Sequence, residues 1–113
     1  MKIFQNLNFV LVNTSHPGNI GACARAMNSM GILNLLLVNP KEFPSKEAEA
    51  RAKSGMKVLE KAKVHKNINE AIGTSNLIIG TSARSRSMPW PMMEVSILGK
   101  TINESLANKD EVS

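Results

Sequence analysis

The stretch "HPGNIGACARAM", His16 to Met27, decides the fold because it places a helix directly after a buried strand. Apolar, β-rich runs lie on both sides of it, at Phe9–Val12 and Leu33–Val38, and a third follows at Leu77–Gly80. Strands that alternate with helices favour a parallel sheet, and nearly all-apolar strands suit burial on both faces. The sequence therefore predicts an α/β fold, a parallel sheet flanked by helices.

The helix is expected to run from about Asn19 to Met30. Apolar residues at helical spacing predict a core stripe that consists of Ile20, Cys23, Ala24, Met27 and Met30. The opposite face carries Gly18, Gly21, Ala22, Arg25 and Ser29. Since four of these five are small, another surface can approach closely while Arg25 projects. The alternative is that the glycines only permit a tight turn and that Arg25 is an ordinary surface cation.

Two single residues near this turn have plain interpretations. His16 has no Asp or Ser partner visible in the sequence, so it is expected to cap the helix or to be solvated rather than to act as a base. Cys23 lies on the apolar stripe and is expected to be a small buried residue rather than a nucleophile.

Capping patterns predict further helices. One helix is expected between Ser45 as N-cap and Gly55 as C-cap, another after "NINE" at Asn67–Glu70, and a third after "TINE" at Thr101–Glu104. The final stretch "SLANKDEVS", Ser105 to Ser113, is interpreted as a polar tail that adds no strand.

Composition limits the class of protein. With 113 residues, 42% of them hydrophobic and 20% charged, the chain reads as one globular domain or as part of a larger one. The single cysteine, Cys23, excludes an internal disulfide and a cysteine metal site, and no metal is expected. No apolar run approaches the ~20 residues that span a bilayer, and the N-terminus is too short and polar for a secretory signal. A cytoplasmic protein is expected.

Positive charge is unevenly distributed along the chain, whose net charge is +5. No Asp or Glu occurs from Met1 to Lys41 or from Ala71 to Met93. The charge around Arg25, Arg84 and Arg86 is therefore unopposed, which suits a polyanion or an anionic group on a small ligand. A basic surface that serves solubility alone is the alternative.

A second corner lies in "NLIIGTSARSRSMPWP", Asn76 to Pro91, where a buried strand is followed by hydroxyls and then by two arginines. Ligands collect beyond the carboxyl ends of parallel strands, so both corners are expected at the same edge. The glycines of the first corner are spaced G-x-x-G, which matches neither the dinucleotide fingerprint nor a Walker motif. A nucleotide-binding enzyme with an unusual phosphate turn is therefore a weak alternative.

Taken together, "NFVLVNTSHPGNIGACARAMNSMG" with "LLLVNP", and "LIIGTSARSR" with "PWP", resemble the SpoU branch of the SPOUT methyltransferases. The resemblance runs from about Asn6 to Leu98. Within the branch it is nearest to the TrmJ type, which methylates a ribose 2′-hydroxyl in the tRNA anticodon loop. It implies a Rossmann-like sheet whose C-terminal part is tied into a trefoil knot, S-adenosylmethionine in that knot, and a homodimer with RNA bound across its interface.

The resemblance also implies roles for individual residues. Asn19 and Arg25 match catalytic positions of the first motif. Gly80, Thr81 and Ser82 fall on the loop that lines the cofactor pocket, and Arg84 and Arg86, with Arg25, on positions that hold RNA. Because a guanidinium stays protonated near neutrality, we expect Arg25 to grip the phosphate beside the target ribose and to stabilise developing oxyanion character. A phosphate oxygen or water then takes the proton.

One departure from the branch limits what the chain does alone. Motifs of the forms G-R-E-x-x-G-L and S-L-N, which supply much of the knot and the cofactor site, do not occur in it. Residues 1–113 are therefore expected to be a single partial domain, the N-terminal portion without the knot-forming part, with an incomplete cofactor site and inactive in isolation. The alternative is a non-catalytic RNA-binding or dimerisation module.

Overall fold

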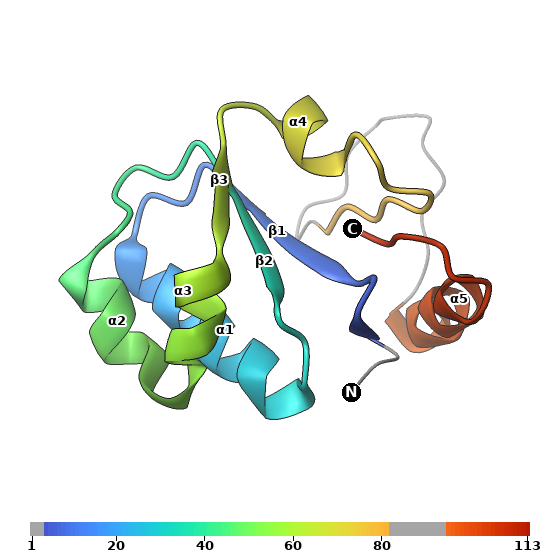
Figure 1. The fold of residues 1–113 in the computed structure, drawn as a ribbon, viewed down its shortest axis with the longest axis horizontal. Helices are drawn as coiled ribbons and strands as arrows, with labels where there is room; N and C mark the ends of the chain where they lie inside the picture. The colour runs from blue at the N-terminus through green and yellow to red at the C-terminus, as the bar shows by residue number, and fades with distance from the viewer. Residues whose placement is uncertain (1–3, 82–94) are drawn as a thin grey trace.

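The computed structural model describes residues 4–81 and 95–113. In chain order the elements are β1 (Asn8–Val12), α1 (Pro17–Met30), β2 (Asn34–Val38), α2 (Lys46–Ala52), the 3-10 helix η2 (Lys53–Gly55), α3 (Met56–Lys61), β3 (Lys63–His65), α4 (Ile68–Ile72) and α5 (Val95–Ala107). The strands form a parallel sheet in the order β1-β2-β3. Helices α1, α2 and α3 lie on one side of this sheet, and α4 and α5 lie on the other (Figure 1). The predicted α/β class with a parallel sheet is confirmed.

Helix α1 forms where the sequence predicts it, with a start two residues earlier. The Nδ1 atom of His16 accepts a hydrogen bond from the backbone N–H of Gly18 at 3.1 Å, and Pro17 occupies the first turn. At the other end Gly31 adopts a left-handed φ of 76°, which ends the helix. The predicted core stripe is buried at Ile20, Ala24 and Met27, and Cys23 is half-buried. The prediction was wrong for Met30, which is 51% exposed because it lies in the last turn, beyond the edge of the core.

Gly21 and Gly55 allow α1 to pack tightly against the helices that follow β2. A Cβ atom on Gly21 would overlap the carbonyl oxygen of Ala48 in α2, and one on Gly55 would lie 2.5 Å from the carbonyl oxygen of Ala24. Gly55 was expected to end a helix, and this was wrong because the chain continues from η2 directly into α3. Its role is the close approach of two backbones.

The capping patterns have different outcomes. Ser45 caps α2 by accepting the N–H of Glu47 at 3.2 Å, as predicted. Asn67 caps α4 by accepting the N–H of Glu70 at 3.0 Å, also as predicted. The pattern at Thr101–Glu104 does not start a helix, because α5 already runs through it.

The third strand of the sheet is β3, which the sequence analysis did not predict. It has only three residues, and Val64 at its centre is 54% exposed. The predicted strand at Leu77–Gly80 does not form as a regular strand: it has one isolated bridge, between Leu77 and Val112, and backbone hydrogen bonds to Glu111 and Ser113.

The C-terminal segment Glu111–Ser113 corrects the prediction of a polar tail. Val112 forms parallel bridges to Leu7 on one side and to Leu77 on the other, and it is 1% exposed. The N–H of Asn8 donates to the carbonyl of Val112 at 2.8 Å, and the N–H of Ser113 donates to the carbonyl of Leu77 at 2.9 Å. One apolar side chain in a polar stretch is enough to anchor it, because its partners lie far away in the sequence.

Val112 is therefore expected to contribute to stability. Replacing Val112 with alanine removes two buried carbons and should lower the free energy of unfolding by about 1–3 kcal/mol. Val64→Ala, at an exposed strand position, is the matched control and should cost less than about 0.5 kcal/mol. Urea unfolding followed by circular dichroism measures both, and equal effects of the two substitutions would contradict the buried pairing of Val112.

Candidate functional site

The first corner and the loop at Gly80 and Thr81 point to the same edge of the sheet. Val112 aligns Leu7 with Leu77, and both flanking segments run parallel to it. Counting four residues forward on each places Thr81 level with Leu11, near the end of β1. Gly80 and Thr81 are exposed at this carboxyl edge, where ligands of parallel sheets collect. Ser82, Arg84 and Arg86 lie outside the described residues.

Arg25 lies on the third turn of α1 and is exposed. Helix α1 runs back from the carboxyl edge towards the start of β2. The Cα of Arg25 therefore lies roughly 12 Å along the helix axis from the Cα of Pro17. Asn19 is exposed in the first turn, nearer to the edge. Within the described residues the guanidinium of Arg25 makes no ion pair. No carboxylate of the described residues thus neutralises it, and its flexible side chain can extend from the third turn of the helix towards the carboxyl edge.

The face of α1 that carries Arg25 is partly buried inside the chain and partly exposed to solvent. Gly18 and Gly21 are buried: a Cβ on Gly21 would meet α2 of the same chain first, and one on Gly18 would meet the side chain of His16 and then Oε1 of Glu47. Ala22 and Ser29 are exposed together with Arg25. The predicted close approach thus exists at the glycines, and a strip of small exposed residues remains around Arg25.

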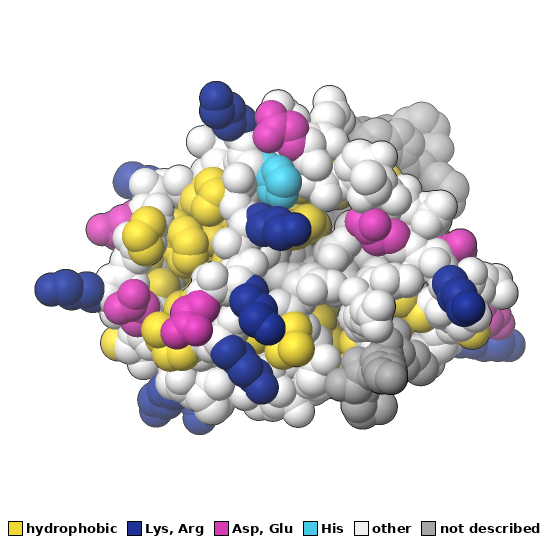
Figure 2. All heavy atoms as spheres, in the orientation of Figure 1, with side chains coloured by type: hydrophobic (Ala, Val, Ile, Leu, Met, Phe, Trp, Pro, Cys, Tyr) yellow, Lys and Arg dark blue, Asp and Glu magenta, His cyan; other side chains and the backbone are white. Residues whose placement is uncertain are grey.

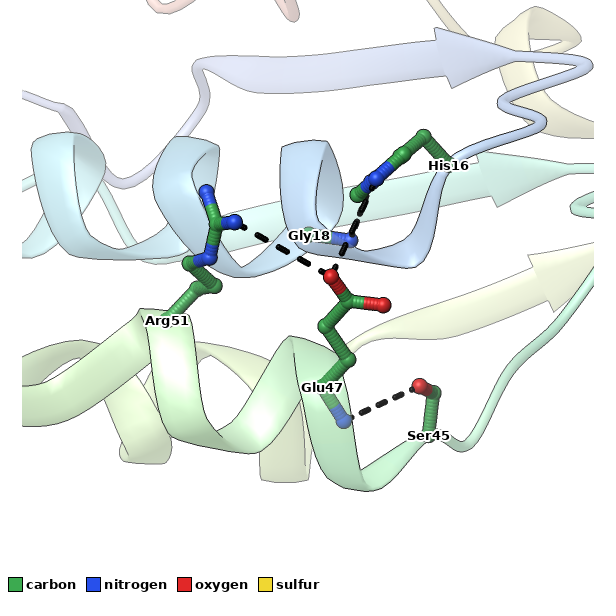
Figure 3. A network of polar contacts seen from close by, with 5 residues as sticks. All are labelled: His16, Gly18, Ser45, Glu47 and Arg51. Atoms are coloured by element: carbon green, nitrogen blue, oxygen red, sulfur yellow. Dashed lines mark hydrogen bonds and ion pairs between the residues drawn. The ribbon is translucent and has the colours of Figure 1, made fainter.

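Polar contacts at the start of α1 tie it to α2 (Figure 3). His16 accepts the N–H of Gly18 through Nδ1, and its Nε2 lies 3.8 Å from Oε1 of Glu47. The same oxygen lies 3.9 Å from Nη2 of Arg51. His16 therefore caps the helix, which was one of the two roles expected for it, the other being a solvated side chain. Because the N–H of Gly18 already donates to His16, it is not free to bind a phosphate.

Glu47 and Arg51 were not singled out from the sequence, although their i,i+4 spacing in "KEAEARAK" is a visible signal. Both side chains are about half exposed, so their ion pair contributes little to stability. Cys23 behaves as a structural residue, because its partial burial raises the pKa of its thiol. A raised pKa leaves little thiolate at neutral pH, which disfavours nucleophilic chemistry.

A hollow of about 380 Å³ lies on the opposite face of the sheet from α1, towards the amino-terminal ends of the strands. Its lining includes Asn8, Asn34, His65, Glu70 and Glu111. Lysine and histidine side chains stand beside acidic ones on this face (Figure 2). These groups largely satisfy one another: Asn8 donates to Glu111 at 3.1 Å, and His65 lies 3.7 Å from Glu70. The hollow is thus lined by polar groups that already have partners, and it is distinct from the carboxyl edge.

Gly80 and Thr81 offer an open backbone and an exposed side chain to a cofactor, but not an enclosed site. A Cβ on Gly80 would have no atom of residues 4–81 or 95–113 within 4 Å, and Thr81 is exposed. The described residues therefore leave this loop open on that side and do not form a cradle around a bound molecule.

Over residues 4–81 and 95–113, no three His, Cys, Asp or Glu side chains gather where they could hold a metal ion. In the same ranges, no helix has the length and apolar character needed to cross a membrane.

Comparison with known proteins identifies close relatives. The chain is 42% identical over 111 residues to the tRNA (cytidine/uridine/adenosine-2′-O-)-methyltransferase TrmJ of Pseudomonas aeruginosa, covering 98% of this chain and 43% of that protein. It is 47% identical over 92 residues to the tRNA (cytidine/uridine-2′-O-)-methyltransferase TrmJ of Salmonella typhimurium, covering 81% of this chain and 38% of that protein. The chain thus spans about two fifths of the length of these curated relatives.

Solved structures show the same fold. A probable methyltransferase from Bordetella pertussis Tohama I matches with a TM-score of 0.86 and 31% identity, over 95% of this chain and 65% of that one. TrmJ from Z. mobilis ZM4 matches with a TM-score of 0.81 and 32% identity, over 84% of this chain and 43% of that one. The model of the SpoU rRNA Methylase family matches residues 6–102. With the fold, the motifs and these matches in agreement, the chain belongs to the SpoU rRNA Methylase family.

Proposed function

We propose that this chain is the N-terminal portion of a tRNA ribose 2′-O-methyltransferase that uses S-adenosylmethionine and acts in the cytoplasm. The observation that carries the proposal is Arg25, whose guanidinium is exposed on α1 and makes no ion pair with residues 4–81 or 95–113, in a chain 42% identical to a tRNA 2′-O-methyltransferase. Residues 1–113 form one partial domain in this proposal. The part that completes the domain, including the trefoil knot, belongs to the remaining length that the relatives have.

The proposed chemistry assigns positioning and charge to the residues of this chain. The cofactor supplies the methyl group. Arg25 grips the phosphate beside the target ribose with two parallel N–H donors and stabilises negative charge that develops on the 2′-oxygen. Asn19, one turn and a half nearer to the carboxyl edge, orients the same nucleotide. The proton of the hydroxyl passes to a phosphate oxygen or to water, because a protonated guanidinium has no acceptor.

Gly80, Thr81 and Ser82 are proposed to form one side of the cofactor site. The backbone of Gly80 is open towards the part of the chain that the structure describes, where no atom would lie within 4 Å of a Cβ. An open glycine permits close approach of a ligand to the backbone, and the hydroxyl of Thr81 is exposed beside it. The other side of the site comes from the absent C-terminal part.

The exposed strip of α1 is the proposed homodimer contact. Its small side chains let a second α1 approach closely, and they leave Arg25 at the junction of two copies, where RNA would bind across both. The strip consists of Asn19, Ala22, Arg25, Ala26 and Ser29, all exposed.

Titration calorimetry with S-adenosylmethionine tests the proposal. We expect no binding by residues 1–113 and binding by the full-length enzyme, meaning this chain together with the C-terminal part of its relatives. Tight binding by residues 1–113 alone would mean that the cofactor site has been misplaced. If neither form binds the cofactor but both bind tRNA, the non-catalytic RNA-binding module is the correct alternative; its supporting observation is the open loop at Gly80 and Thr81.

Arg84 and Arg86 are predicted to bind RNA phosphates. Each substitution with alanine in the full-length enzyme should weaken tRNA binding and lower the salt slope of log Kd by about 0.7–0.9, because one phosphate contact and its released counterion are lost. Arg51→Ala is the control, since that arginine pairs with Glu47, and it should leave the slope unchanged. Fluorescence anisotropy from low to high salt measures the slopes. An unchanged slope in the Arg84 and Arg86 variants would assign those residues to structure.

A further inference from the structure

The imidazole ring of His16 uses both of its nitrogens (Figure 3). Nδ1 accepts the backbone N–H of Gly18 at 3.1 Å, and Nε2 lies 3.8 Å from Oε1 of Glu47. A ring nitrogen that accepts an N–H carries no proton, so the proton of the neutral ring is on Nε2. The carboxylate of Glu47 faces this proton and favours the same tautomer. The ring is therefore oriented by α2 while it caps α1.

The first turn of α1 directs two of its backbone N–H groups to His16. The side chain accepts the N–H of Gly18, and the carbonyl oxygen accepts the N–H of Asn19 at 3.0 Å. The backbone of His16 has a φ of −109° and a ψ of 112°, the extended conformation that is usual for an N-cap residue. The position of His16 therefore determines the position of the turn that carries Asn19.

Gly18 packs directly against the ring of His16, where a larger residue would not fit. A Cβ on Gly18 would lie 2.9 Å from Cε1 and 3.0 Å from Nδ1 of His16, and 3.4 Å from Oε1 of Glu47. The φ of Gly18 is not positive, unlike that of Gly31, so its backbone conformation does not require glycine. Because helices ordinarily favour alanine over glycine, the ring of His16 is the feature that accounts for glycine here. We call this packing of the His16 ring on Gly18 the imidazole seat.

The imidazole seat lies at the start of α1, close to Asn19. Before Asn19 in the chain, His16 faces Glu47 of α2, and after it Gly21 packs closely on the backbone of Ala48 in the same helix. The first turn of α1 is thus held against α2 on both sides of Asn19, whose own side chain is exposed. A serine or asparagine in place of His16 could cap α1, but it would be too short to face α2 as well.

We propose that His16 is a positioning residue for methyl transfer: its Nδ1, seated on Gly18, fixes the first turn of α1 and thereby sets where Asn19 meets the target nucleotide. In this role His16 contacts neither the RNA nor the cofactor, and it takes no proton in the reaction. The inference rests on the proposed function, in which Asn19 orients the nucleotide that Arg25 grips.

Single-turnover methyl transfer by variants of the full-length enzyme tests this role. His16→Ala removes the acceptor and should lower the rate at least about tenfold, because the nucleotide is held in a less productive geometry. His16→Asn restores an acceptor that suits an N-cap and should stay within about threefold of the wild-type rate. tRNA affinity should change less than about threefold in both, since the phosphate contacts of Arg25 are unchanged.

The imidazole seat is tested by combining substitutions at Gly18 and His16. Gly18→Ala alone displaces the ring and should lower the rate at least about tenfold. In the His16→Asn background the same substitution should cost less than about threefold, because the shorter side chain leaves room for the added methyl group. His65→Asn is the matched control: Nδ1 of His65 also faces a carboxylate, that of Glu70 at 3.7 Å, but α4 is capped by Asn67. This variant should retain the wild-type rate.

Hydrogen exchange measured by NMR on residues 1–113 reports the cap without tRNA or cofactor. The amide of Gly18 should exchange at least about tenfold faster in His16→Ala than in the wild type, while the amide of Ala24, inside α1, stays equally protected.

Four results would overturn the proposal: a rate for His16→Ala within threefold of the wild type, a rate for His16→Asn as low as that of His16→Ala, an equal loss from Gly18→Ala with and without the ring, or unchanged exchange at Gly18. A wild-type enzyme that transfers no methyl group would reject the proposed function, whereas the exchange experiment would still show whether His16 caps α1. Failure of the cap would leave methyl transfer by the wild type standing.

Discussion

Replacing Arg25 with lysine in the full-length enzyme is expected to lower the rate of methyl transfer to tRNA by about 100-fold or more. Lysine keeps the positive charge but loses the planar fork that holds a phosphate through two parallel bonds. The target ribose then lies in a less productive geometry, while the attraction to the RNA backbone remains. We expect tRNA affinity to change by less than about threefold, because one phosphate contact is retained by the new cation.

Single-turnover kinetics with labelled cofactor and an anisotropy titration separate the two effects. Arg51→Lys is the matched control, since Arg51 is also an exposed arginine on a neighbouring helix but pairs with Glu47. That variant should retain its rate. Near-normal turnover in the Arg25 variant would reject both its positioning role and its role in charge stabilisation.

Replacing Gly21 with alanine is expected to have the largest effect on stability, a loss of about 2–4 kcal/mol. The added methyl group would overlap the carbonyl oxygen of Ala48, which belongs to the rigid backbone of α2. The two helices must separate, and this moves Arg25, one turn further along α1. Thermal and urea unfolding measure the loss.

Gly99→Ala is the control for this substitution. Gly99 also lies inside a helix, and a Cβ there would contact none of the described residues within 4 Å. The usual preference of helices for alanine should then stabilise the protein by about 0.5–1 kcal/mol. If both substitutions stabilised the protein, the close approach of α1 and α2 would be contradicted.

Local signals predicted the first half of the fold well. The spacing of Ile20, Ala24 and Met27 fixes one face of α1, and the two apolar runs beside it fix a parallel strand pair. Ser45 and Asn67 were identified as N-caps because their hydrogen bonds reach only two or three residues along the chain. Such short-range bonds leave a clear pattern in a sequence.

Non-local pairing could not be predicted in the same way. Val112 is buried by Leu7 and Leu77, which lie far from it in the sequence, and a single apolar residue in a polar stretch carries no periodicity. The strand β3 is three residues long and half exposed at Val64, so neither alternation nor a long apolar run marks it. Both are recognised only when their partners are in place.

The sequence predicted which residues make up the candidate site, but not which of them are covered by neighbouring elements. The pattern around Arg25 showed a cation among small residues, and the structure adds that Gly18 and Gly21 are covered by His16 and α2 of the same chain while Ala22 and Ser29 stay exposed. Which small residues are free depends on where α2 lies. The sequence of α1 alone contains no information about that position.

Identifying the methylated atom tests the central claim most directly. The full-length enzyme is incubated with unmodified tRNA and methyl-labelled S-adenosylmethionine, the RNA is digested to nucleosides, and the labelled nucleoside is analysed by mass spectrometry. The account predicts label on a ribose 2′-oxygen, falling about 100-fold or more with Arg25→Lys. Label on a base, or ribose label that persists unchanged in the Arg25 variant, would contradict it.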